Sequence, residues 1–324
     1  MNSIDGPVLV TGASGFVGRA LVARLALDGM SVRAGRHHAP TAEPAGVQAF
    51  GGLDLGAPTD WSAALHGARA VVHCAARVHV MRDTTADPLA EFRRVNVQGS
   101  LALASQAASE GVRRFIFVSS IGVNGAATTD RPFHADDAPA PHSPYAQSKL
   151  EAELALLALA EQTGLEVVII RPPLVYGPDA PGNFGSLMNA GYRGIPLPFG
   201  SVKNQRSLIA LDNLVDLLLR CVNHPAAAGQ VFLASDGEDL STPELLRRTA
   251  AALGRKAHLL PVPVALLRGA SQVFGKAAMM QSLCASLQID IEKTRSRLGW
   301  SPPVSPDQAL ASSAQRYLAT RLQR

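Results

Sequence analysis

The chain has 324 residues, of which 47% are hydrophobic and 17% charged, a balance typical of a folded globular protein. Its net charge of +4 comes from dispersed Lys and Arg residues, which disfavours a nucleic-acid-binding protein and suits an anionic small-molecule ligand. Cys74, Cys221 and Cys284 lack the spacing of a zinc site or a disulfide framework. No apolar run reaches the ~18 residues of a membrane span. We therefore expect a cytoplasmic protein with no metal, no nucleic acid and no membrane insertion.

Strand and helix patterns alternate through the first half of the chain. Helical patterns are clearest at residues 16–29 and 87–111. Short apolar runs predict strands at residues 7–12, 31–35, 47–50, 70–75, 114–120 and 166–172. These runs lack polar alternation, so the strands should be buried on both faces. The pattern predicts an α/β fold with a doubly wound parallel sheet.

The composition changes after Pro172. Residues 171–200 are rich in Pro and Gly, which is typical of ordered binding loops. Residues 208–237 return to helix and strand, and the chain is mostly helical from residue 241 onward. We predict a dinucleotide-binding domain and a smaller, mostly helical substrate-binding lobe. The first takes residues 1–172 and 205–236, and the second takes residues 173–204 and 237–324.

A glycine-rich turn follows the first predicted strand. Gly12, Gly15 and Gly18 have GxxGxxG spacing and lie where a buried strand gives way to a helix. Glycine permits the tight turn and the close approach of backbone to a pyrophosphate, which the helix N-terminus stabilises. The turn therefore predicts a dinucleotide site.

The end of the second predicted strand bears on which dinucleotide binds. Arg33 and Arg36 lie there without a neighbouring carboxylate, and arginine accommodates the 2′-phosphate of NADP. We expect NADP(H) to be preferred, with NAD(H) as the alternative. The adjacent His37 and His38 lack further metal ligands.

The segment "SPYAQSKLEAELA" places Tyr145 and Lys149 four residues apart on one helix face. Ser143 suits the N-cap of this helix, and Pro144 suits its first position. A tyrosine with the usual pKa near 10 is a poor proton carrier at neutral pH. We expect the Lys149 ammonium to lower the pKa of Tyr145.

Two serines end the predicted strand at residues 114–120. Ligands of open α/β sheets bind beyond the carboxyl ends of strands, where Ser119 and Ser120 would emerge. A hydroxyl there can donate a hydrogen bond to a substrate carbonyl oxygen. The serines and Tyr145 together predict carbonyl or alcohol chemistry.

The ordered motifs "TGASGFVG", "HCAA", "NVQGS", "SS" and "YAQSK" resemble those of the extended short-chain dehydrogenase/reductase family. The family includes nucleotide-sugar 4-epimerases, 4,6-dehydratases and 4-keto-reductases. Later landmarks, "RPPLVYGP", "QRSLIALDNLVD" and "DIEKTRSRLGW", extend the resemblance to nearly the whole chain. It implies a Rossmann-type fold, a UDP-sugar substrate and a homodimer.

The resemblance also implies residue roles. Tyr145 is the acid/base, Lys149 its ribose-binding partner, and Ser120 the donor to the carbonyl oxygen. Asn96 supports the structure or a proton relay. The implied cofactor contacts are Gly12, Ser14, Gly15, Phe16, Val17, Arg36, Asp54, Leu55, Ala75, Ala76, Tyr145, Lys149 and Pro172. The implied substrate contacts are Ser120, Tyr145, Asn183 and Arg206, with Arg206 on the diphosphate.

The chain departs from the family pattern at several positions. Ile121 and Gly122 replace the Asp-Glu pair of the dehydratases, which argues against 4,6-dehydration. Asn124 replaces a usual tyrosine, and Leu174 stands where many epimerases have a substrate-binding asparagine. No arginine lies between Lys276 and Asp290, where epimerases often have a second diphosphate contact. These departures disfavour a standard UDP-glucose epimerase.

Three functions stay open at this stage. The segments "SSIGVNG" and "LPFGSVKNQRSLIALDNLVDLLL" resemble bacterial O-antigen and capsule enzymes that reduce UDP-4-keto-6-deoxy-N-acetylhexosamines. Arg36 favours such a reductase, because a reductase consumes NADPH. A UDP-glucose or UDP-GlcNAc 4-epimerase with the same catalytic residues is the alternative. A non-catalytic NADP-binding regulator is the third hypothesis, disfavoured because Tyr145 and Lys149 are present.

Overall fold

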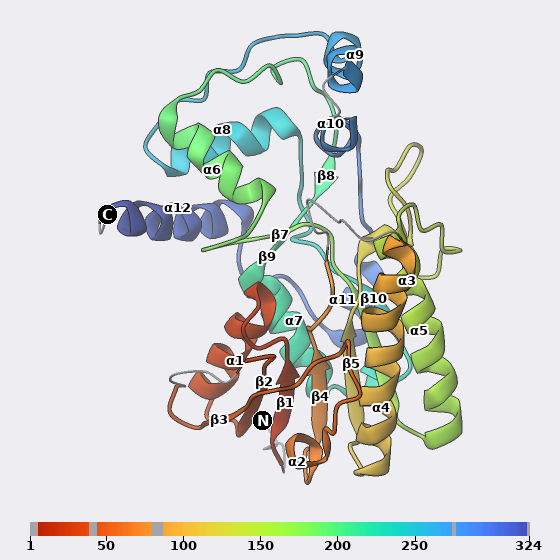
Figure 1. The fold of residues 1–324 in the computed structure, drawn as a ribbon. Coiled ribbons are helices and arrows are strands. Elements are labelled where there is room, and N and C mark those ends of the chain that lie inside the picture. The colour runs from red at the N-terminus through yellow and green to blue at the C-terminus, as the bar shows by residue number, and fades with distance from the viewer. Residues whose placement is uncertain (1–5, 39–43, 79–86, 274–276, 323–324) are drawn as a thin grey trace.

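The computed structural model describes residues 6–38, 44–78, 87–273 and 277–322. Its centre is a seven-stranded parallel sheet in the order β3–β2–β1–β4–β5–β6–β10 (Figure 1). This strand order confirms the predicted doubly wound fold. The strands are β1 (Val8–Thr11), β2 (Val32–Gly35), β3 (Val47–Phe50), β4 (Ala70–His73), β5 (Arg114–Val118), β6 (Glu166–Arg171) and β10 (Val231–Leu233).

Helices cover both faces of the sheet because successive side chains of each strand point to opposite faces. Val8 and Val10 of β1 pack in the cluster that includes α1 (Phe16–Leu27) and α7 (Leu211–Asn223). Leu9 belongs to the opposite cluster, with side chains of α4 (Ser100–Ser109) and α5 (Pro144–Thr163). The two layers bury the uninterrupted apolar runs that predicted the strands. The short helix α2 (Ser62–Leu65) packs with α4.

The predicted helix at residues 87–111 is interrupted by a π-helical turn. The segment consists of α3 (Pro88–Phe92), the π-helical turn Arg93–Gly99 and then α4. Asp87 caps α3 by accepting a hydrogen bond from the Ala90 N–H at 3.0 Å. The π turn buries Asn96 and Gly99. Such turns frequently occur at functional sites.

Helix α5 begins and ends as its sequence predicts. The Ser143 hydroxyl accepts a hydrogen bond from the Ala146 N–H at 3.2 Å, and Pro144 occupies the first turn. Gly164 ends the helix in the left-handed conformation, at φ +77°. The cap fixes where the helix starts, and therefore the height of Tyr145 above the sheet.

A mostly helical lobe lies above the carboxyl ends of the strands (Figure 1). Its helices are α6 (Asn183–Arg193), α8 (Thr242–Ala252), α9 (Val264–Val273), α10 (Ala277–Cys284) and α12 (Pro306–Leu322). Two short strand pairs join it to the sheet domain: β7 (Val175–Tyr176) with β9 (Ile209–Ala210), and β8 (Arg206–Ser207) with β11 (Asp239–Leu240). The lobe confirms the predicted helical C-terminal region.

The segment around α11 (Glu292–Leu298) packs with the sheet domain. Ile291, Leu298 and Trp300 belong to the hydrophobic cluster on the α1–α7 face. The Trp300 indole N–H also donates to Asp216 at 2.8 Å. The division of the chain into two domains at these residue numbers stays a prediction. Residues 291–300, which the sequence assigned to the lobe, pack against the sheet domain.

Two predicted positions lie outside what the structure describes, namely Lys276 and the side chain of Asn183. Within the described ranges, no helix combines the length and the hydropathy that crossing a bilayer would require.

Candidate active site

The turn after β1 packs backbone against backbone. Gly12 has φ +65°, and a Cβ there would lie 2.7 Å from the Ala75 nitrogen beyond β4. A Cβ on Gly18 would lie 2.2 Å from the Gly12 carbonyl oxygen. Glycine is therefore required at both positions. The turn brings the start of α1 and the end of β4 together.

The N-terminus of α1 fits a diphosphate. Gly15 is its N-cap and supplies no side-chain hydrogen bond, and the first turn contains no acidic residue. The backbone N–H groups of Phe16 and Val17 therefore have no side-chain cap. An anion could accept hydrogen bonds from them. Ser14 and Gly15 are exposed beside them. These residues fit the phosphates of a dinucleotide, as the sequence predicts.

The two arginines near β2 have different surroundings. Arg33 donates to the Ala64 carbonyl at 3.0 Å and to the His66 carbonyl at 2.6 Å, and its guanidinium lies over the Phe50 ring. Burial lowers the pKa of Arg33. Arg33 is thus held by the protein. Arg36 follows the last residue of β2, at the predicted ribose position.

Asp54 and Leu55 lie beside the end of β2. The Leu53 N–H donates to the Arg36 carbonyl at 3.0 Å, and this bond holds the 53–55 segment there. The Asp54 carboxylate accepts from the Gly56 N–H at 2.7 Å and lies 3.6 Å from His37. A carboxylate therefore stands near the predicted adenosine end, although none follows β2 directly in the sequence.

Asn96 ties the segment after β4 to the catalytic helix. Its side chain donates to the Arg77 carbonyl at 3.0 Å and to the Ser148 hydroxyl at 3.1 Å, and accepts from the Arg77 N–H at 2.8 Å. Ser148 donates in turn to the Tyr145 carbonyl at 2.8 Å. Asn96 therefore connects these two segments, and it fixes the chain just beyond the predicted contacts Ala75 and Ala76; its support of a proton relay stays a prediction.

Tyr145 lies at the start of α5 with its ring edge-on to Phe92, at 6.0 Å between centroids. Burial raises the pKa of Tyr145 to about 12. The expectation that Lys149 lowers this pKa is wrong for the protein's own groups, because desolvation of the phenol dominates. Tyr145 is consequently a protonated donor at neutral pH.

Lys149 is almost fully buried, at 2% exposure. Its ammonium donates to the Val118 carbonyl at 2.8 Å and lies 4.3 Å from the centroid of the Phe117 ring. Burial lowers the pKa of Lys149 to about 8, while the charge of Glu153 opposes the shift. Lys149 is therefore poised to lose its charge just above neutral pH.

The two serines after β5 have different environments. Ser119 is buried, and its hydroxyl donates to the carboxylate of Glu153. The Ser120 hydroxyl is half-buried and accepts from the Gly122 N–H at 3.1 Å, which leaves its own proton free to be donated. The geometry thus favours Ser120 over Ser119 as the donor to a substrate oxygen.

A buried polar network behind these serines was not predicted from the sequence. Glu153 and Arg171 form an ion pair at 2.5 Å, with side chains 2% and 5% exposed. Arg171 also donates to the Asn124 side-chain oxygen at 3.0 Å. The network joins α5, β6 and the turn after Ser120. The one available signal was the position of Glu153, four residues after Lys149 on the same helix face.

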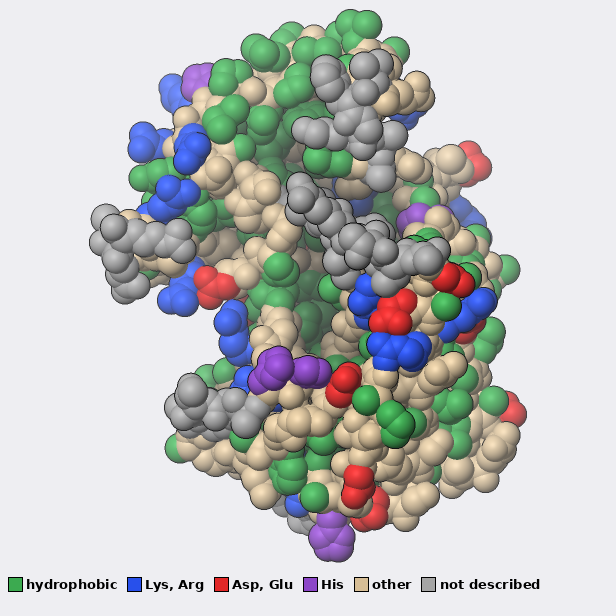
Figure 2. Space-filling model, in the orientation of Figure 1, with side chains coloured by type: hydrophobic (Ala, Val, Ile, Leu, Met, Phe, Trp, Pro, Cys, Tyr) green, Lys and Arg blue, Asp and Glu red, His purple; other side chains and the backbone are tan. Residues whose placement is uncertain are grey.

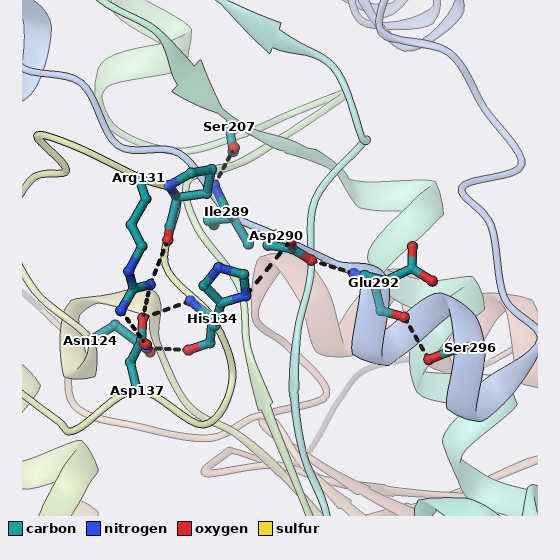
Figure 3. A network of polar contacts seen from close by, with 10 residues as sticks. Asn124, Arg131, His134, Asp137, Ser207, Ile289, Asp290, Glu292 and Ser296 are labelled. Carbon is teal, nitrogen blue, oxygen red and sulfur yellow. Dashed lines mark hydrogen bonds and ion pairs between the residues drawn. The ribbon is translucent and has the colours of Figure 1, made fainter.

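Asn124 extends the network into the loop that precedes α5 (Figure 3). Its side-chain nitrogen donates to the His134 carbonyl at 3.0 Å. Asp137 accepts from the His134 N–H at 2.7 Å and pairs with Arg131 at 2.7 Å, while His134 faces Asp290 at 3.7 Å. Main-chain hydrogen bonds from Phe133 to Gln288 and from Asp290 to Phe133, both at 2.9 Å, attach the loop to residues 286–293.

The predicted substrate residues lie on the lobe side. Arg206 is half-buried in β8 and donates to the Ala285 carbonyl at 3.0 Å, and burial lowers its pKa. Asn183 begins α6. Leu174 is 41% exposed just before β7. Pro172 holds the turn after Ser120, since its carbonyl accepts from the Ile121 N–H at 2.9 Å.

The parallel sheet, the uncapped α1 N-terminus and the Tyr145–Lys149 face of α5 are features of the short-chain dehydrogenase/reductase class. Residues 8–234 match the model of the NAD dependent epimerase/dehydratase family. The chain therefore belongs to this family.

Individual relatives match over nearly the whole chain. A UDP-glucose 4-epimerase from Vibrio cholerae is 46% identical over 314 residues, covering 96% of this chain and 95% of that protein. MoeE5 in complex with UDP-glucose and NAD superposes with a TM-score of 0.78 at 26% identity, covering 98% and 100%. UDP-glucose 4-epimerase from Thermotoga maritima shares the fold, with a TM-score of 0.78 at 22% identity, covering 97% and 99%.

Proposed function

We propose that the chain catalyses oxidation and reduction at C4 of a UDP-hexose, with 4-epimerisation as the first candidate reaction. The observation that carries this proposal is the 46% identity to a protein named UDP-glucose 4-epimerase. The Tyr145, Lys149 and Ser120 arrangement supports it, because carbonyl–alcohol interconversion needs a proton carrier and an oxygen donor. A bound nicotinamide dinucleotide would supply the reversible two-electron oxidation and reduction.

Each side chain takes one role. Ser120 donates a hydrogen bond to the C4 oxygen, where negative charge develops. Tyr145 gives or takes the proton of that oxygen, and the raised pKa of about 12 favours the donor direction in the protein alone. Lys149 supplies positive charge beneath the site while it is protonated, below a pKa of about 8.

The substrate's diphosphate is assigned to Arg206, with Asn183 at the start of α6 as a second contact. A guanidinium suits a diphosphate because its planar N–H groups bind two oxygens at once. Dehydration is not part of the proposal. A Cβ on Gly122 would lie 3.3 Å from both the Ala146 Cβ and the Ser120 oxygen, so a dehydratase glutamate there would require these neighbours to move by a few tenths of an ångström.

Reduction of a UDP-4-keto-6-deoxy-N-acetylhexosamine is the second candidate. Arg36 directly after β2 favours it, because arginine accommodates the 2′-phosphate of NADPH. The exposed apolar Leu174 at an epimerase asparagine position also favours a different sugar. NADP(H) preference, a homodimer and the minor regulator hypothesis stay predictions.

Two assays with purified protein separate the candidates. In the first, UDP-glucose or UDP-GlcNAc is supplied without added reductant, and the 4-epimer is quantified. In the second, NADPH or NADH is supplied with the 4-keto sugar, and loss of reduced nicotinamide is followed. Epimer formation supports the first candidate, and stoichiometric reductant loss supports the second. Dinucleotide binding without either reaction would refute both.

Tyr145→Phe tests the assigned chemistry. The variant keeps the ring but removes the proton, so we expect turnover to fall by roughly 10²–10⁴-fold. Tyr192→Phe, at a half-buried tyrosine of the lobe, is the matched control and should retain activity. Circular dichroism checks that both variants fold. Full activity of Tyr145→Phe would remove Tyr145 from the mechanism.

A further inference from the structure

The charges of the lobe are strongly asymmetric. Residues 180–211 and 245–289 contain nine Lys and Arg residues but no Asp or Glu, although the chain has 26 acidic residues. Five of these cations are exposed and form no ion pair within the described residues: Arg193, Lys203, Arg247, Lys256 and Arg268. Arg248, by contrast, pairs with Glu238, Glu244 and Asp307, which lie outside these two stretches, so the exposed cations that lack an ion pair in the described chain include these five.

The far end of the same region exposes large apolar side chains. Leu266 is 65% exposed, Leu260 50%, Ile195 43% and Met279 41%. These are four of the eight large hydrophobic residues found exposed in the described chain. We call this end the lobe tip, formed by α9, α10 and the segments 195–203 and 256–263. In Figure 2 the upper end of the molecule is mainly green, with blue at its margin and no red.

The two loop segments of the lobe tip are joined to each other and packed against α9 and α10. Main-chain hydrogen bonds join its two segments: Leu197 to His258 and Leu260 to Leu197, each at 2.8 Å, and Gly200 to Leu260 at 2.9 Å. Beneath them Phe199, Val202, Leu267 and Met280 form one buried cluster. Leu266 points outward while its neighbour Leu267 is 7% exposed, so α9 has one face in the cluster and one in solvent.

We propose that the lobe tip docks on the surface of an anionic lipid bilayer. Aliphatic side chains beside unpaired cations suit the boundary between acyl chains and anionic headgroups. A second copy of the chain fits poorly, because two such tips would bring like charges together. Nucleic acid fits poorly as well, because the exposed apolar residues are aliphatic and offer no aromatic ring for base stacking.

The position of the tip is compatible with catalysis. Figure 1 shows α9 at the end of the lobe opposite the sheet, whereas α5 lies beside the sheet. Docking would hold the enzyme peripherally while the site stays open to a water-soluble nucleotide sugar. The inference does not depend on which sugar the enzyme uses.

Vesicle flotation with the full-length protein tests the proposal. We expect binding to vesicles of phosphatidylcholine with phosphatidylglycerol, weak binding to phosphatidylcholine alone, and loss of binding in high NaCl. Leu266→Glu should weaken binding about tenfold or more, because it removes an aliphatic contact and adds a repelled charge. Leu27→Glu is the matched control, since Leu27 of α1 is 84% exposed on the other half of the molecule.

A charge pair completes the test. Lys256→Glu should weaken binding by about fivefold or more, whereas Arg297→Glu, at an exposed position of α11, should not change it. Sugar turnover in solution should be the same for all four variants. No binding to anionic vesicles, or equal losses in the control variants, would overturn the proposal. If the wild type does not bind vesicles but is a dimer, and the Leu266→Glu variant is a monomer, the tip is assigned to contact with a second copy instead.

Discussion

Two polar networks meet at Asn124 and differ mainly in burial. The Glu153–Arg171 network lies behind the catalytic serines, with both charged side chains at most 5% exposed. The loop network of Figure 3 pairs Arg131 with Asp137, at 60% and 19% exposed. Both use short carboxylate–guanidinium contacts. Burial determines how much each network contributes to the free energy of unfolding. A charge left unpaired inside the protein is costly, whereas one at the surface is solvated by water.

Among the substitutions in the two networks, Glu153→Gln should lower the free energy of unfolding most. It leaves Arg171 charged, buried and poorly compensated, and we expect a loss of about 3–5 kcal/mol in the free energy of unfolding. Glu151→Gln is the matched control two residues away, because its pair with Arg93 is partly exposed, at 24% and 48%, and should contribute about 1 kcal/mol or less. Urea unfolding measures both. Equal losses would show that burial does not separate the two pairs.

Asn124→Ala should have an intermediate effect. It removes the only described side chain that hydrogen-bonds both to Arg171 and to the His134 carbonyl. We expect a loss of about 1–3 kcal/mol in the free energy of unfolding, since the buried Arg171 and the part-buried His134 carbonyl each lose a hydrogen bond. Turnover should fall too, because the turn carrying Ser120 is less constrained. A stable variant with normal kcat would show that the two networks act independently.

Asp137→Asn in the exposed network should cost about 1 kcal/mol or less. Hydrogen bonding to Arg131 lowers the pKa of the Asp137 carboxyl. Its stabilisation is therefore present above the pKa of a free carboxyl and is lost as the pH falls through the lowered value. Thermal unfolding at neutral and acidic pH should show a difference between variant and wild type that vanishes in acid. A constant difference would exclude the ion pair as its cause.

The smallest expected effect is a shift in the pH profile. Turnover should decline as the pH rises through about 8, where Lys149 loses its charge. Glu153 raises the pKa of Lys149, so Glu153→Gln should move this decline to lower pH, whereas Glu151→Gln should not. The profile of kcat against pH measures the shift, and a purely structural role for Glu153 would leave it unmoved.

The sequence predicts the sheet well because buried parallel strands are continuous apolar runs. The predicted strands at residues 47–50 and 166–172, for example, match β3 and β6 within one residue. The glycine turn was predictable as well, because its close backbone contacts need glycine. Arg33 shows the limit, since the sequence does not reveal that its guanidinium bonds to carbonyls of a distant segment.

The buried pair was hidden for a related reason. Glu153 and Arg171 lie 18 residues apart, and each resembles an ordinary surface charge in its own element. Their burial follows from how α5 packs on β6, which is a property of the fold as a whole. The raised pKa of Tyr145 has the same origin, because desolvation depends on neighbours far away in the sequence.

The π-helical turn at Arg93–Gly99 changes the rotation of α3 about the helix axis relative to α4. Each residue of an α-helix advances the chain by about 100° around the axis. The wider π turn contains one extra residue, so the side chains of α3 are rotated relative to those of α4. Phe92, which meets the Tyr145 ring edge-on, lies on the rotated side. Deleting a single residue from the turn would swing Phe92 by about a quarter of a revolution. The position of the Phe92 ring beside Tyr145 thus depends on the number of residues in the turn as well as on the residue type.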